Sequence, residues 1–254
     1  MNGPLGWKAV YFDLSRTACS APTIQAARVY IIYTAASARS ARSVRGNGVR
    51  IVAWNCRMAF AKKRGLLANL RPDIAVIAEC SRDSILACKD DGFATCWWGD
   101  NQNKGLGVLA ASPWTLEAGR RPTQKWVAPV RVQGPLSFLL IAVWACPVGM
   151  SKEKNYVGQI FEAVTRHPGW FADQQPVVVC GDFKSNAIWD QGRKIRNHSA
   201  VVKLLRDRNL FSAYHAFFRK NIGRKPDRHI FFGTEKNDAF TSTTYSCPIA
   251  GLPT

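Results

Sequence analysis

The sequence is short of acidic residues, of histidine and of long apolar runs. Asp and Glu total 17 against 35 Lys and Arg, which gives a formal net charge of +18 at pH 7, and there are 4 His. Pro, Arg or Gly interrupts each apolar run before it reaches the roughly 20 residues of a membrane-spanning helix. These shortages argue against a transmembrane protein. The excess of basic over acidic residues favours an anionic partner such as nucleic acid, a phosphoester or an acidic lipid, although a solvated basic surface also explains the charge.

The 8 cysteines lack the spacing of a metal-binding or redox motif, because no two of them form a CxxC pair. Cys80 and Cys180 end apolar runs, where a thiol behaves as a small hydrophobic group. The sequence therefore predicts a reducing compartment and a cytoplasmic location. Residues 29–38 end in small residues as a secretory leader does, but their apolar core is short and Arg28 lies late in the chain, so no leader is expected.

The chain has 254 residues, 47% of them apolar, which is enough to bury a substantial core. Residues 1–48 keep no periodicity for long, and 36–48 are basic and of low complexity, so this segment is predicted to be poorly ordered. From residue 49 to 254, apolar strands and helices alternate, which indicates one α/β domain. Strands are expected at 49–55, 73–80, 105–110, 126–134, 136–145 and 176–183, and helices at 59–70, 155–167 and 197–208.

Polar side chains stand where three of the expected strands end. Asn55 ends the first strand, Glu79 the second and Asp182 the last. In open α/β sheets the carboxyl ends of strands border the crevice where sites form. Two carboxylates and an amide suit a hard cation such as Mg²⁺ or Mn²⁺ that also binds a substrate phosphate. The alternative is that each residue is a helix cap or a solvated loop residue.

The strand-end motifs occur in a familiar order. The segments "AWN" at 53–55, "PDIAVIAE" at 72–79 and "VVVCGDF" at 177–183, with "KGLGVLA" at 104–110, resemble motifs of the endonuclease/exonuclease/phosphatase superfamily. The resemblance implies a four-layer α/β sandwich in which two mixed β-sheets pack face to face between helices. It also implies a monomer.

The resemblance further implies a divalent-metal-dependent phosphoester hydrolase, either a phosphodiesterase or a nuclease. Glu79 and Asn55 would hold Mg²⁺ or Mn²⁺, and Asp182 would position or deprotonate the attacking water. The substrate would be a phosphoester, with nucleic acid among the candidates. The alternative is a catalytically inactive remnant that acts as a basic nucleic-acid-binding protein.

Two residues depart from the family pattern inside these motifs. Lys184 stands where the family has Asn. It either serves catalysis as a point-charge phosphate binder, damages the site by weakening Asp182 as a base, or points to solvent. Trp144 stands where many members have His, and an indole cannot exchange protons, so we expect it in the core or the site wall. The paired residues Trp97 and Trp98 either pack in the core or stack on a base.

The C-terminal residues also depart from the family, whose closing Asp-His pair does not occur in "TSTTYSCPIAGLPT" at 241–254. Codons for His-Ile-Asp-Tyr-Ile-Phe-Leu-Pro, shifted by one base, spell the residues from Thr241 to Pro248. We therefore hypothesise a frameshift just before Thr241, which leaves the domain without its last strands. The alternative is that this segment is an ordinary polar edge strand.

Overall fold

The computed structural model describes residues 7–13, 27–34, 48–120, 124–147, 156–172, 176–191, 195–208, 210 and 212. The hypothesis of a frameshift before Thr241 and the expectation of missing last strands both concern residues outside these ranges. No helix in the described ranges is both long and apolar enough to cross a membrane.

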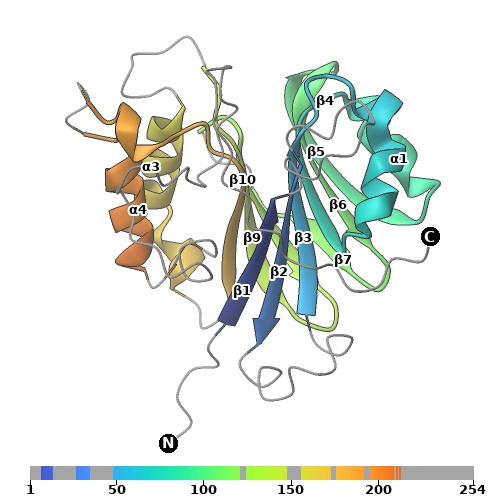
Figure 1. Cartoon of the computed structure of the whole chain (residues 1–254), viewed down its shortest axis with the longest axis horizontal. Coiled ribbons are helices and arrows are strands. Elements are labelled where there is room, and N and C mark those ends of the chain that lie inside the picture. Colours follow the sequence, from blue (N-terminus) through green and yellow to red (C-terminus); the bar gives the residue numbers. More distant parts are fainter. Residues whose placement is uncertain are drawn as a thin grey trace, which may run out of the picture.

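Two β-sheets form the centre of the molecule, and helices lie outside them (Figure 1). The first sheet has the strand order β1-β2-β3-β4-β6-β5 and the second β10-β9-β8-β7. Each sheet is mixed, because β3 runs parallel to β4 and β10 parallel to β9 among otherwise antiparallel pairs. The strands are β1 (Trp7–Asp13), β2 (Ala27–Thr34), β3 (Gly48–Asn55), β4 (Ile74–Cys80), β5 (Phe93–Asn101), β6 (Lys104–Ala111), β7 (Thr115–Ala118), β8 (Val127–Gln133), β9 (Phe138–Trp144) and β10 (Val177–Asp182).

The helices complete the layers. The first sheet is covered by α1 (Phe60–Leu70), with α2 (Arg82–Leu86) after β4, and the second by α3 (Val157–Arg166) and α4 (His198–Arg206) (Figure 1). The Asn197 side chain accepts a hydrogen bond from the Ala200 amide and caps α4. The predicted α/β sandwich of two mixed sheets flanked by helices is confirmed.

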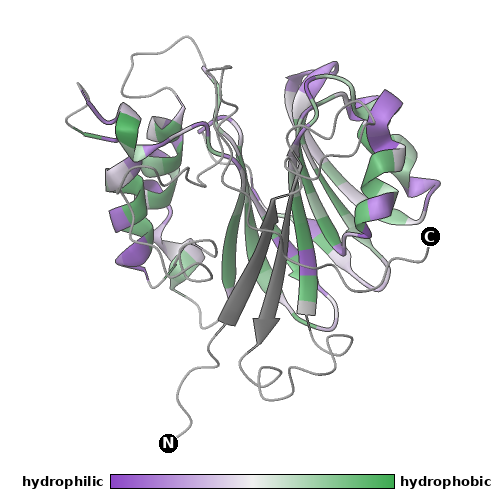
Figure 2. Cartoon of the chain, in the orientation of Figure 1, coloured by the Kyte–Doolittle hydropathy of each residue, from purple (hydrophilic) through white to green (hydrophobic). Residues whose placement is uncertain are grey.

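Apolar residues are frequent along the strands of both sheets (Figure 2). On β3, β4 and β6 of the first sheet, the period of two separates residues of two hydrophobic cores. On β3, Ile51 and Ala53 belong to the cluster that includes the second sheet. Val52 and Trp54 belong to the cluster that includes Phe60 of α1. Both faces of β3 are therefore apolar, and this is why the segment has a nearly continuous hydrophobic sequence.

Two strands occur where the sequence predicted irregular structure before residue 49. The strand β2 pairs antiparallel with both β1 and β3, and so extends the first sheet. The sequence of β2, "ARVYIIYT", is rich in β-branched and aromatic residues, which favour strands. The small residues that follow it resemble the end of a secretory leader and concealed this strand signal. The proposed domain boundary near residue 48 stays a prediction.

Candidate functional site

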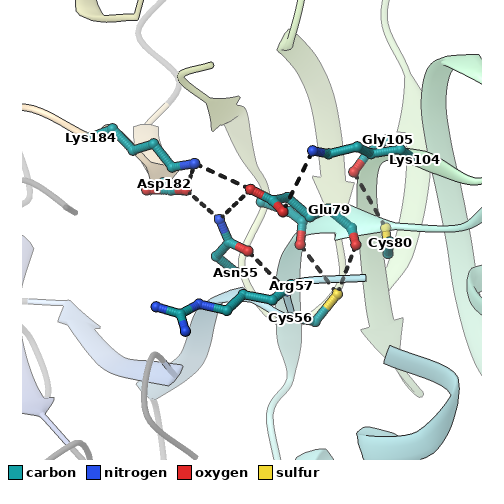
Figure 3. Close-up of polar contacts among 10 residues, drawn as sticks. Asn55, Cys56, Arg57, Glu79, Cys80, Lys104, Gly105, Asp182 and Lys184 are labelled. Atoms are coloured by element: carbon teal, nitrogen blue, oxygen red, sulfur yellow. Dashed lines mark hydrogen bonds and ion pairs between the residues drawn. The ribbon is translucent and has the colours of Figure 1, made fainter. Parts of the chain in front are cut away.

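Polar side chains at the ends of three strands, from both sheets, contact one another (Figure 3). The Asn55 amide nitrogen donates to Glu79 Oε1 at 3.0 Å and to Asp182 Oδ2 at 2.7 Å. Asn55 and Glu79 come from the parallel neighbours β3 and β4, whereas Asp182 ends β10 of the other sheet. The structure thus brings together the three residues that the sequence singled out, and it does so with one amide bridging two carboxylates.

A backbone irregularity places Glu79. Its φ is 60°, and the pairing of β4 with β6 shifts register between Ala78 and Cys80. A bulge of this kind re-aims one side chain out of the regular alternation of a strand. The Glu79 carbonyl accepts hydrogen bonds from the Met58 amide at 3.0 Å and from Cys56 Sγ at 3.1 Å, so the loop after β3 holds the irregular residue in place.

Asp182 depends on the glycine that precedes it. Gly181 has a φ of 144°, and a Cβ at this position would clash with the Val143 carbonyl oxygen of β9. Only glycine allows both the backbone angle and the close approach of the two parallel strands. Beyond it, the Asp182 carbonyl accepts the Ala145 amide at 2.6 Å, which fixes the backbone of the acid to β9.

Lys184 lies inside the site. Its Nζ is 3.2 Å from Glu79 Oε1 and 3.6 Å from Asp182 Oδ2, and its side chain is 21% exposed. The interpretation of Lys184 as a residue that points to solvent is therefore wrong. Its φ of 45° lies in the left-handed region, and the turn directs the side chain back across the strand end.

A second cation, Lys104, was not predicted from the sequence. Its Nζ is 3.6 Å from Glu79 Oε2 and lies over the Trp144 ring, 5.3 Å from the ring centroid. Trp144 is buried, and its ring lies 4.7 Å from that of Trp126. The expectation that Trp144 lines the site or the core is confirmed. The sequence signal for Lys104 was its place at the start of "KGLGVLA", but a lysine at a strand start is usually solvated.

Charge in the site is balanced, with two carboxylates facing two ammonium groups. Burial raises the pKa of Glu79, but the hydrogen bond from Asn55 and the charges of Lys184 and Lys104 together bring it below its ordinary value. Burial lowers the pKa of Lys184, but the nearby Asp182 and Glu79 raise it above its ordinary value. Glu79 is ionised and Lys184 is protonated at neutral pH.

Three further side chains are packed within the fold, those of His198, Trp97 and Trp98. His198 is buried with Nδ1 3.0 Å from Ser185 Oγ, a contact that joins α4 to the loop after β10. Trp97 donates from Nε1 to the Cys80 carbonyl at 3.3 Å, and Trp98 packs against the core between the sheets. Packing, and not an open stacking platform, is thus the arrangement of the paired tryptophans.

Several solved structures are similar to this chain in fold, at low sequence identity. No family model matches the chain, and no curated protein matches it. A humanized D. rerio TDP2 with 14 mutations is similar at 13% identity and a TM-score of 0.44, over 57% of this chain and 65% of that one. Truncated Caenorhabditis elegans TDP2 is similar at 13% identity and a TM-score of 0.42, over 53% of this chain and 61% of that one. The chain therefore spans less than two thirds of either structure.

A third similar structure is the endonuclease domain of TRAS1, a telomere-specific non-LTR retrotransposon. It has 15% identity and a TM-score of 0.44, and the match covers 63% of this chain and 72% of that domain. These are likenesses of fold at low sequence identity. The strand-end motifs resemble those of the endonuclease/exonuclease/phosphatase superfamily, and the two-sheet architecture is the one that this resemblance implies.

Proposed function

We propose that this chain hydrolyses phosphoesters at the site formed by Asn55, Asp182 and Lys184 beside Glu79. The observation that carries the proposal is the amide bridge, in which Asn55 Nδ2 contacts carboxylates from both sheets at 3.0 and 2.7 Å. A buried amide held between two acids needs the fold around it to be in place, and such clusters of interacting polar groups are typical of active sites.

Each residue has a role that suits its chemistry. Asp182 is an acceptor, and it is the proposed base for a water that attacks phosphorus. The water gives its proton to Asp182, the bond from phosphorus to the leaving oxygen breaks, and that oxygen departs with the electron pair. Lys184 and Lys104 supply positive charge for the phosphoryl oxygens, where charge develops. Asn55 and Glu79 hold the base and the ammonium groups in position.

The Mg²⁺ or Mn²⁺ predicted on Glu79 and Asn55 does not fit these residues as they are arranged. The Asn55 oxygen accepts the Arg57 amide at 3.0 Å, so the amide presents its nitrogen to the carboxylates. Both Glu79 oxygens face ammonium groups. Within the described ranges, no three or more His, Cys, Asp or Glu side chains group to hold a metal. We derive no step through a metal ion.

A second candidate function, binding of nucleic acid without cleavage, is favoured by one observation. Two ammonium groups neutralise the two carboxylates, so a phosphate does not meet a bare pair of negative charges at the sheet edge. With a net charge of +18, the chain would then bind the phosphate backbone, and its affinity would fall as salt rises.

Hydrolysis of bis(p-nitrophenyl) phosphate tests the first function, because its nitrophenolate leaves without needing a proton. We expect the wild-type chain to cleave it in EDTA, and Asp182→Asn to lose about 10²-fold or more, the usual effect of removing a general base. Asp100→Asn is the matched control, since Asp100 pairs with Lys125 at an exposed position.

Wild-type cleavage no faster than that of Asp182→Asn contradicts the proposed hydrolysis. Fluorescence anisotropy with a labelled abasic-site duplex then tests the second candidate. Affinity that falls with salt and is indifferent to EDTA supports binding without cleavage.

We also propose a cytoplasmic location. The support is chemical, since the six cysteines of the described ranges, Cys56, Cys80, Cys88, Cys96, Cys146 and Cys180, are all free thiols. Burial raises the pKa of the Cys180 thiol to about 12, which keeps it protonated and unreactive. Such cysteines suit a reducing compartment.

A further inference from the structure

We infer that Lys184 is the resident cation of this site, and that the chain therefore excludes Mg²⁺ and Mn²⁺ from Glu79 and Asp182. The inference goes beyond the proposed hydrolysis, because it concerns which cation neutralises the two carboxylates. It holds whether or not a substrate is cleaved.

The position of the ammonium group is the first support. Lys184 Nζ lies between the two acids, 3.2 Å from Glu79 Oε1 and 3.6 Å from Asp182 Oδ2. A divalent ion shared by these carboxylates needs the same region of space, since metal and ammonium both seek the carboxylate oxygens. The two cations exclude each other by volume and by charge.

Both oxygens of Glu79 and Oδ2 of Asp182 already have polar partners where a shared metal would bind. Glu79 Oε2 is paired with Lys104 at 3.6 Å, and Asn55 donates its amide hydrogens to Glu79 Oε1 and Asp182 Oδ2. A metal ion entering here would replace hydrogen bonds from Asn55 and would lie beside a second ammonium group. Like charges at such short range in a partly buried site repel strongly.

The backbone at residue 184 has a conformation that lysine does not favour. Its φ of 45° is a left-handed angle that Asn adopts several-fold more readily than most residues. The turn itself suits Asn, which is the residue at this position in the family whose motifs the chain resembles. Lys184→Asn therefore keeps the turn while it removes the ammonium group.

The two lysines also determine the class of ligand that the site binds, which is a phosphate. The positive charge that faces a phosphate oxyanion comes from Lys184 and Lys104 and not from a bound metal. A lysine acts as a point charge for phosphate and requires no metal to do so.

Titration with Mn²⁺, followed by calorimetry and by the electron paramagnetic resonance signal of free Mn²⁺, tests the inference without any substrate. We expect wild type and Glu79→Gln to give the same binding isotherm. Lys184→Asn should gain one Mn²⁺ site, with an affinity at least about tenfold higher than any that wild type shows. The double variant Lys184→Asn with Glu79→Gln should lose this site, since a carboxylate is the ligand that Mn²⁺ prefers. Circular dichroism establishes that each variant is folded.

Two controls separate charge from side-chain identity. Lys184→Arg keeps a cation and should bind no additional Mn²⁺. Lys125→Asn removes a half-exposed lysine from its pair with Asp100 and should resemble wild type. Wild-type binding of Mn²⁺ that Glu79→Gln abolishes would overturn the inference, and this comparison does not depend on the folding of any variant at residue 184. Folded Lys184→Asn that gains no site would overturn it too.

Discussion

Glu79 combines a strained backbone with a densely paired side chain. Its left-handed φ costs conformational energy, and that cost is offset by the ion pairs and the hydrogen bond that its carboxylate makes. Such an exchange of local strain for a cluster of polar contacts is characteristic of functional sites. The cluster also makes the carboxylate a source of pH-dependent stability.

The first prediction at this scale concerns the pH dependence of Glu79. Its folded pKa lies below its ordinary value, so its ionised form stabilises the native state at pH values above the unfolded-state pKa, and the contribution is lost as pH falls through the folded pKa. We expect Glu79→Gln to lower the melting temperature at pH 7, and the gap to wild type to shrink below about pH 4. Thermal unfolding followed by circular dichroism from pH 7 to pH 3 measures it.

Glu117→Gln is the control for this experiment, because the Glu117 side chain is 70% exposed and its pair with Arg131 is long, at 3.8 Å. It should change the melting temperature little at any of these pH values. A gap between wild type and Glu79→Gln that stays constant from pH 7 to pH 3 would show that the ion pairs of Glu79 do not stabilise the fold.

At the scale of elements, the parallel pair β9 and β10 determines where Asp182 lies. Gly181 pairs with Val143, and Asp182 with Trp144, so the register delivers the acid to the end of the sheet beside a buried indole. The close approach at Gly181 is the point where this register is most sensitive to a larger side chain.

We expect Gly181→Ala to destabilise the fold by about 1–3 kcal/mol or more, because the φ of 144° is strained for alanine and the added Cβ meets the Val143 carbonyl oxygen. Urea unfolding measures the change. Gly65→Ala is the matched control: Gly65 lies within α1 with nothing within 4 Å of an added Cβ, so alanine there should stabilise the helix by about 0.5–1 kcal/mol. Equal stability of Gly181→Ala and wild type would contradict the assigned role of the glycine.

The sequence predicted the elements around the site better than it predicted the contacts inside it. Asn55, Glu79 and Asp182 were identifiable because each is a polar residue that ends an apolar run. Lys184 was identified as unusual, but its direction depends on a left-handed turn that the sequence does not reveal. Lys104 was missed because its partner, Glu79, lies on another strand, and cross-strand pairing depends on the strand order β4-β6.

At the scale of the whole molecule, the two sheets share one core, and the site lies at the edge where both sheets end. The buried apolar side chains of both cores, as far as the structure describes them, come from residues between Val49 and Leu205. The strands β1 and β2 add to the first sheet through backbone pairing with β3. Among the residues whose side chains the structure describes, those of the core and the site lie after residue 48.

The last prediction follows from this division. A chain that begins at Gly48 should keep a single cooperative thermal transition, because all of the proposed site residues and the core residues that the structure describes lie after that position. It should also self-associate more than the full chain, since removing β2 leaves the backbone of β3 as an open sheet edge. Differential scanning calorimetry and analytical ultracentrifugation measure the two effects. Loss of the cooperative transition would show that β1 and β2 are integral to the domain, and would move its boundary toward the N-terminus.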